Sequence, residues 1–178
     1  IVLGSLSADY VKNYAKDDSF TLAHLRKNID RDINVNEMLR RLLLQMDSDR
    51  AWIMFFHNGS ATTTGIPFKK MSNIYEATRK GVSVEIHNIQ GVPLSSIPEV
   101  VDLLIKNNDC IDEWTDKQKN STFKYMVEAQ GIKYMMWHRI LQNDSIIGIV
   151  GVDYLTAPTN SLMGTSYEGE LNMGTHLR

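Results

Sequence analysis

Two apolar runs near the C-terminal end of the chain carry the clearest pattern in the sequence. Ile132–Leu141 and Ser145–Asp153 predict two β-strands, joined by the polar connection Gln142-Asn143-Asp144, where Asn and Asp tolerate the left-handed backbone of hairpin turns. Apolar residues occupy both faces of the second strand, which indicates a central strand covered on both sides. Gly148 and Gly151 weaken that strand unless another group packs close to its backbone. The rest of the domain is expected to cover this hairpin.

The N-terminal part of the chain predicts helices. Apolar residues at three- and four-residue spacing favour a helix over Ala8–Asn28. A second, clearer helix is expected to begin at Asn34, with Glu37 completing a capping box, and to end near Asp47-Ser48-Asp49.

The middle of the chain predicts strands first and then short helices. Arg50–His57 is a strand by its aromatic and aliphatic content, and Asn58-Gly59 turns the chain. Helix and strand patterns compete over Pro67–Lys80, where we favour a strand followed by an irregular stretch. The remaining predicted elements are a short strand over Val82–Ile86, a helix Glu99–Asn107 after Pro98, a brief strand Cys110–Trp114 and a helix Asp116–Gln130 that stops at Gly131. This order indicates an α+β fold.

Composition and length define the class of protein. The chain has 178 residues, 43% of them hydrophobic and 22% charged, and these values favour a single globular domain. The net charge of −2 gives no footprint for nucleic acid, and no run is long enough to span a membrane. We expect an N-terminal helical segment over 1–33, a domain over 34–155 and a flexible tail over 156–178. A cytoplasmic location is expected, with a membrane tether upstream of Ile1 as the alternative.

The segments RAWIMFFHNG, from Arg50, and WHRILQNDSIIGIVGVDYL, from Trp137, resemble the GAF domain, a relative of PAS-type sensor domains. The closing strand of that family commonly alternates aliphatic residues with glycine, as Ile147–Gly151 does here. FHNG followed by GIPFKKMSNIYE is similar to a branch of uncharacterised bacteriophage and bacterial proteins. The resemblance implies a central antiparallel sheet with terminal helices on one face. Loops and short helices on the other face would close a small-molecule pocket, and the N-terminal helices would form a homodimer.

The specialised members of the GAF family are not matched. Bilin attachment needs a suitably placed cysteine, and nothing near Cys110, the only cysteine, supports that role. Sulfoxide reductases of this fold need cysteine pairs, and the Asn-Lys-Phe-Asp-Glu signature of cyclic-nucleotide binders is missing from the sequence. We therefore expect no cofactor.

Candidate ligand-binding residues are polar groups in otherwise apolar surroundings. Polar groups of this kind orient a ligand in a pocket, although strand-end capping, edge protection and a structural salt bridge of Arg139 with Glu76 or Asp153 explain them as well. The candidates are His57, Asn58, Lys69, Ser72, Asn73, Tyr75, Glu76, Trp137, Arg139 and Asp153.

Three function classes follow from these residues. A non-enzymatic sensory domain that binds a small molecule is the leading hypothesis, and a dimerisation or docking module using Ala8–Met46 is the alternative. A hydrolase that assembles Ser72, His57 or His138, and Asp153 is a distant third, because no nucleophile-elbow motif surrounds Ser72. No histidine has a partner at zinc-ligand spacing, so no metal site is predicted.

Overall fold

The computed structural model describes residues 22–61, 67–106, 109–113 and 121–156. Its centre is a six-stranded antiparallel sheet with the order β3-β2-β1-β6-β5-β4. The strands are β1 (Arg50–Ala61), β2 (Pro67–Thr78), β3 (Val92–Pro93), β4 (Asp109–Glu113), β5 (Tyr134–Gln142) and β6 (Ser145–Tyr154). The helices are α2 (Leu22–Gln45), the short 3₁₀ helix η2 (Leu94–Ser96), α3 (Pro98–Lys106) and α4 (Thr122–Ala129). This confirms the predicted α+β fold.

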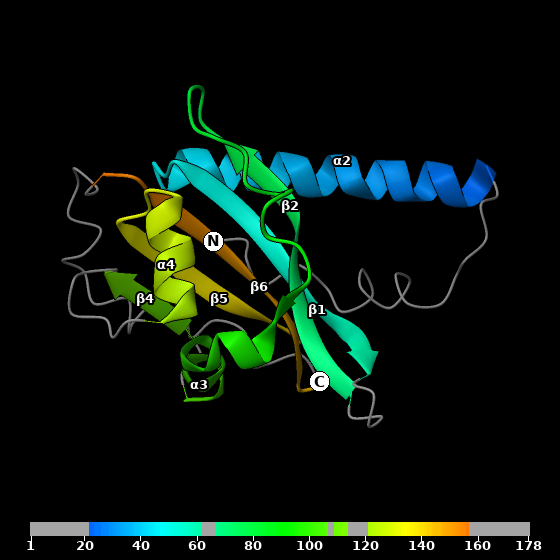
Figure 1. The fold of residues 1–178 in the computed structure, drawn as a ribbon. Coiled ribbons are helices and arrows are strands. Elements are labelled where there is room, and N and C mark those ends of the chain that lie inside the picture. The colour runs from blue at the N-terminus through cyan, green and yellow to red at the C-terminus, as the bar shows by residue number, and fades with distance from the viewer. Residues whose placement is uncertain (1–21, 62–66, 107–108, 114–120, 157–178) are drawn as a thin grey trace.

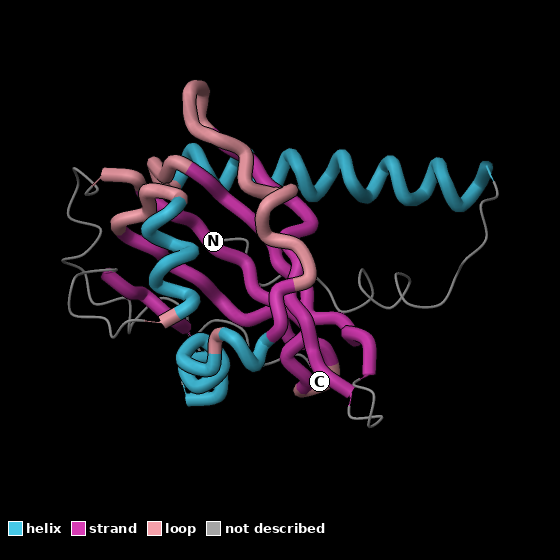
Figure 2. The backbone as a smooth tube through the Cα atoms, in the orientation of Figure 1, coloured by secondary structure: helices cyan, strands magenta, loops and turns pink. Residues whose placement is uncertain are grey.

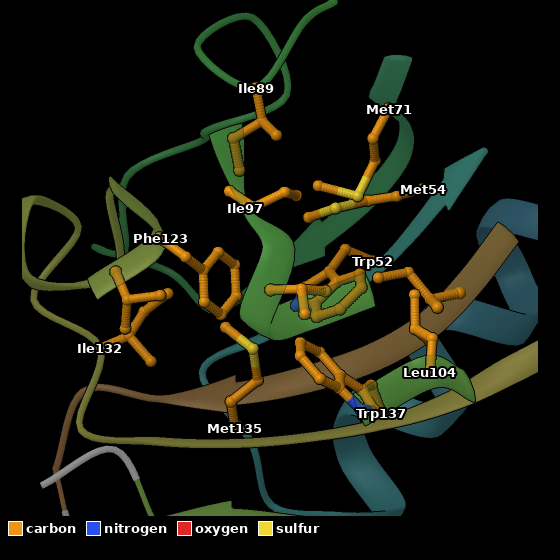
Figure 3. Packing of buried hydrophobic residues seen from close by; sticks show 13 residues of the cluster. Trp52, Met54, Met71, Ile89, Ile97, Leu104, Phe123, Ile132, Met135 and Trp137 are labelled. Atoms are coloured by element: carbon orange, nitrogen blue, oxygen red, sulfur yellow. The ribbon is translucent and has the colours of Figure 1, made fainter. Parts of the chain in front are cut away.

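The sheet separates two hydrophobic clusters. On one face α2 packs Val35, Leu39 and Leu43 against the sheet. On the opposite face α3, α4 and the loop before η2 cover a second cluster (Figure 2). In it Trp52, Met54 and Met71 of the sheet meet side chains of the helices and loop (Figure 3). Sequence-distant elements thus bury both sides of the central strands, as the two-sided apolar pattern of β6 predicts.

The β5–β6 hairpin is confirmed in detail. Gln142 pairs with Ser145, and the two residues between them, Asn143 and Asp144, have φ values of 47° and 59°. Two consecutive positive φ angles are typical of the type I′ turn, whose twist matches that of the flanking strands. The close approach expected at the glycines is also present, since a Cβ on Gly151 would lie 2.5 Å from the Trp52 ring.

A β-bulge in β2 decides which side chains share a face. Ile53 pairs with Tyr75 but Met54 pairs with Asn73, so Ile74 is an extra residue in β2. Residues three apart on a regular strand point to opposite faces. The bulge instead brings Asn73 and Glu76 to the same face, the one opposite α2.

Three expectations about secondary structure are wrong. Leu22–Gln45 is one continuous helix, so Asn34 lies inside it and does not cap a second helix. The alternating residues of 82–86 lie in a non-repetitive loop between β2 and β3. The strand expected to give way to an irregular stretch within Pro67–Lys80 is instead continuous as far as Thr78. The two-residue strand β3 was not predicted.

Other boundaries shift by a few residues or lie outside the described residues. α4 is described from Thr122, capped by the Ser121 hydroxyl, which accepts a hydrogen bond from the Lys124 amide at 3.1 Å. The predicted helix before Leu22 and the predicted tail after Thr156 lie outside the described residues. Within the described ranges, no helix is long and apolar enough to cross a membrane.

Candidate functional site

A buried arginine lies at the start of β1, on the sheet face opposite α2. The side chain of Arg50 is 1% exposed, and it is surrounded by the carboxylates of Asp153, Glu76 and Glu85, with nitrogen–oxygen separations of 3.4, 3.8 and 3.8 Å. The register of β1 with β6 brings Arg50 and Asp153 together, because the two residues lie directly opposite each other. We call these four residues the Arg50 cluster.

The guanidinium of Arg50 is also held by oxygens of the surrounding loops. Its Nε donates to the Ser83 carbonyl at 3.0 Å, and one terminal nitrogen donates to the Ser83 hydroxyl at 2.9 Å and the Gln130 carbonyl at 3.4 Å. These bonds fix the planar group and connect the start of β1 to the loop after β2 and to the end of α4. One cation therefore serves three carboxylates and three further oxygens.

Burial raises the pKa of two carboxyl groups in the Arg50 cluster. Loss of solvation raises the pKa of Asp153 to about 7, although Arg50 favours its charged form. Burial also raises the pKa of Glu76, against the lowering effect of a hydrogen bond from the Glu85 amide and of Arg50. The pKa of Glu85 is lowered, chiefly by a hydrogen bond from the Asn88 side chain. The cluster can thus exchange a proton near neutral pH.

A small cavity of about 20 Å³ adjoins the Arg50 cluster. A cavity of this size holds roughly one water molecule. One buried polar atom of its lining residues, the Oδ1 of Asn73, has no hydrogen-bond partner among the described residues. The rest of the wall is mostly apolar and includes Met126 of α4. It also includes Met54, Met71, Met135 and Phe123, which Figure 3 shows.

Solved structures with the same architecture are known. A phycocyanobilin-bound GAF domain from a cyanobacterial phytochrome matches with a TM-score of 0.54 at 16% identity, over 89% of this chain and 86% of that one. A phycoerythrobilin-bound GAF domain from a cyanobacterial phytochrome gives a TM-score of 0.53 at 15% identity, over 79% of this chain and 81% of that one. The NreA protein of Staphylococcus aureus, mutated in its nitrate binding site, gives a TM-score of 0.54 at 10% identity, over 77% of this chain and 95% of that one. The fold is that of a GAF domain. At these identities the likeness concerns the fold alone. No protein-family model matches the sequence, and no curated protein does.

Three of the predicted site residues meet at the cavity of this GAF fold. Asn73, Glu76 and Asp153 line it, and the Asn73 side-chain amide donates to Glu76 at 3.3 Å. The sequence did not single out Arg50 and Glu85, which complete the cluster. An arginine that opens an apolar strand, directly before Ala51 and Trp52, was the one available signal for Arg50.

Four other predicted residues lie together at the far end of the β1–β2 pair. His57 Nε2 lies 2.9 Å from the Ser72 hydroxyl, which also accepts from the Gly91 amide at 2.9 Å, and Lys69 donates to the Asn58 side chain at 2.7 Å. Arg50, the partner of Asp153, precedes His57 by seven residues on β1, or roughly 20 Å at the rise of a strand. Ser72, His57 and Asp153 therefore do not form a triad.

The remaining three predicted residues are spread over the sheet. Tyr75 faces α2 and donates its hydroxyl to Asp32 at 2.7 Å. Trp137 is buried against Phe123, with ring centroids 5.9 Å apart. Arg139 donates to the Leu104 carbonyl near the end of α3 at 3.0 Å, while the two carboxylates proposed as its partners face Arg50.

The described residues contain no group of three or more histidine, cysteine or acidic side chains arranged to hold a metal ion. In the Arg50 cluster the guanidinium stands among the carboxylates. The chemistry that this arrangement offers is hydrogen bonding and proton exchange in a buried, mostly apolar space.

Proposed function

We propose that this chain is a non-enzymatic sensory domain that binds a small molecule at the cavity beside the Arg50 cluster. The observation that supports the proposal most directly is the unpartnered, buried Oδ1 of Asn73, which lies with buried carboxylates against an otherwise apolar wall. A few convergent polar groups on an apolar surface are typical of ligand sites. Of the residues proposed from the sequence, Asn73, Glu76 and Asp153 would contact the ligand.

Binding of anything larger than a water molecule requires the cavity to widen. Two features of the wall favour such a change. Its four methionines have unbranched side chains that adapt their shape, and Phe123 and Met126 belong to α4, a helix of only eight residues. Ligand entry would move α4 relative to the sheet. Movement of this covering helix is the signal that a sensory domain would pass on.

The test is thermal unfolding of the purified chain across a library of metabolites. A compound that binds only the folded state at 100 times its dissociation constant stabilises it by about 2.7 kcal/mol. We expect a concentration-dependent shift for at least one compound, and loss of that shift in Glu76→Gln. Glu128→Gln, on the exposed side of α4, is the matched control and keeps the shift. A library without any hit contradicts the proposal.

A docking or dimerisation module is the second candidate, and the surface of α2 supports it. Leu22, Leu25, Ile29 and Ile33 are 85%, 39%, 56% and 51% exposed and follow one another at helical spacing. This part of α2 projects beyond the sheet (Figure 1). A stripe of exposed aliphatic residues is typical of a helix that pairs with another helix.

Sedimentation analysis tests the second candidate with a charge introduced into the stripe. We expect the chain to be dimeric at micromolar concentration, and Ile29→Glu to make it monomeric because a buried charge in a helix pair is costly. Lys27→Glu, exposed on another side of α2, is the control and stays dimeric. A wild-type chain that sediments as a monomer excludes self-association through this surface.

A further inference from the structure

The charges of the Arg50 cluster do not balance. The side chains of Glu76 and Asp153 are 2% and 3% exposed and that of Glu85 is 12% exposed, yet within the described part of the chain Arg50 is the only cation that contacts them. The guanidinium hydrogen-bonds three oxygens outside the three carboxylates, and two of its carboxylate contacts are 3.8 Å long. Buried carboxylates need a compensating positive charge or a proton. Three such groups around one cation leave room for a second positive charge.

An independent observation places a hydrogen-bond acceptor at the same point. Asn73 is 2% exposed, and its side-chain nitrogen donates to Glu76, so its Oδ1 must be the atom left without a partner. An unsatisfied buried acceptor is costly, and only a donor relieves that cost. The Oδ1 of Asn73 and the neighbouring carboxylates are all acceptors, so they favour a ligand that donates N–H or O–H hydrogen bonds.

The apolar part of the cavity wall limits which kind of ligand can bring that donor group into the cavity. Trp52 and Phe123 line the cavity with aromatic rings, and four methionines with Ile89, Val127 and Ile132 complete its apolar wall. Aromatic rings attract cations as well as apolar groups, whereas they repel an anion. A ligand with a hydrophilic body would lose its hydration here without replacement.

We infer that the ligand of this cavity is a protonated primary amine with a small apolar body. Its ammonium group would donate to Asn73 Oδ1 and to the carboxylates of Glu76 and Asp153, and its apolar part would lie against Trp52 and Phe123. The inference rests on the proposed ligand-binding function and names its chemical class. Since an ammonium ion and a proton compete for the same carboxylate, binding is coupled to proton release.

The test is isothermal titration calorimetry of the full chain with three probes that share a phenyl body. At pH 8 we expect 2-phenylethylamine, which is protonated, to bind at least about tenfold more tightly than 2-phenylethanol or 3-phenylpropionate, as expected for charge-assisted hydrogen bonds. Titration at pH 6.5 in two buffers of different ionisation enthalpy should show net proton release on amine binding. The expected dissociation constant is higher at pH 6.5 than at pH 8.

Variants then place the ammonium group. Asp153→Asn keeps the shape of the side chain, and we expect it to weaken amine binding about tenfold and to reduce proton release. Asp102→Asn, an exposed carboxylate of α3, is the matched control and changes neither. Circular dichroism confirms that each variant is folded.

The outcomes separate this inference from the proposed function. Equal binding of the amine and the alcohol leaves a ligand site but overturns the choice of a cation. Amine binding that Asp153→Asn leaves unchanged places the amine elsewhere and overturns the inference. If a metabolite from the library binds and depends on Glu76, but no amine binds, the proposed function stands without this inference. If neither the library nor the amines bind, both fail.

Discussion

At the scale of the residue, the indole ring of Trp52 packs directly against the backbone of Gly151. These two residues face each other across the central pair β1–β6, and the indole ring occupies the space where a side chain of residue 151 would stand. A glycine weakens a strand in general, because it adds no packing and loses more backbone entropy on folding. Here its missing side chain is what admits the largest ring of the cavity wall.

We predict that Gly151→Ala lowers the free energy of unfolding by about 1–3 kcal/mol, the usual cost of overpacking. The added Cβ would meet the Trp52 ring at 2.5 Å and the Met136 carbonyl at 2.7 Å. Urea denaturation measures the change. Ser145→Ala, at the exposed start of β6, is the control and should cost little. A stabilised Gly151→Ala variant, as expected for a glycine in an open strand, would contradict this packing.

The raised pKa of Asp153 predicts how stability depends on pH. In the unfolded chain the carboxyl titrates near 3.8 and in the folded chain near 7, so between these values only the folded state holds the proton. The stabilisation is therefore fully present below pH 3.8 and is lost as the pH rises through 7. Asp153→Asn removes this term, because the amide does not titrate.

We expect the wild-type midpoint of urea unfolding to fall between pH 5 and pH 8 more steeply than that of Asp153→Asn. The difference between the two curves isolates the carboxyl, since Glu76 and the other acids titrate in both proteins. Parallel curves would show that Asp153 has an ordinary pKa in the folded chain.

At the scale of the element, α2 has a docked end and an exposed end. Its C-terminal half buries Val35, Leu39 and Leu43 on the sheet, whereas its N-terminal half carries the exposed stripe from Leu22 to Ile33. Stability and association should therefore depend on different halves of one helix.

Leu39→Ala and Leu44→Ala test this division within α2. Leu39 is 2% exposed and its truncation should cost about 2–5 kcal/mol, the range for a buried leucine replaced by alanine. Leu44 is 76% exposed, and its truncation should change the free energy of unfolding by less than about 0.5 kcal/mol. Thermal or urea unfolding measures both. Similar losses for the two variants would mean that α2 docks through another face.

Local patterns predicted the elements that depend on local chemistry. The hairpin turn at Asn143-Asp144 and the strand character of Arg50–His57 follow from backbone preference and side-chain type. The predicted break near Asn34 failed because a polar N-cap signature is equally compatible with the exposed side of a long helix. The alternating residues 82–86 failed as a strand because side chains take the place of a strand partner: the Ser83 carbonyl accepts from Arg50 and the Glu85 amide donates to Glu76.

The site was harder to predict than the fold, for a physical reason. Asn73 and Glu76 share a face only through the bulge at Ile74, and Arg50 meets Asp153 only through strand pairing across the sheet. The alternation of apolar and polar residues along a single strand reveals neither the bulge nor the pairing. It did identify polar residues in apolar surroundings, which is why Asn73, Glu76 and Asp153 were among the candidates.

At the scale of the whole molecule, the centre of the sheet is covered twice and its edges are short. β1 and β6 lie in the middle with a hydrophobic cluster on either face, whereas β3 at one edge has two residues. Opening of the central strands exposes both clusters, but opening of an edge exposes little.

Hydrogen exchange followed by mass spectrometry should show this gradient. We expect peptides from 145–154 to exchange most slowly, near the rate set by global unfolding, and peptides from 79–97 to exchange much faster. Protection of the 79–97 loop equal to that of β6 would indicate that the wall of the cavity does not open separately from the sheet.

The pairing of β1 with β6 also determines when the domain can be completed during synthesis. The Arg50–Asp153 contact joins residues 103 positions apart, whereas β1 and β2 are neighbours in sequence. A nascent chain can pair β1 with β2 early, but the other edge of β1 stays open until β6 leaves the ribosome. During that interval Trp52, Ile53 and Met54 lie in a strand with one unpaired edge. Unpaired apolar strand edges are a usual starting point for aggregation. A chain terminated before Ser145 would retain that edge permanently, so chaperone binding to stalled or truncated chains should concentrate on β1.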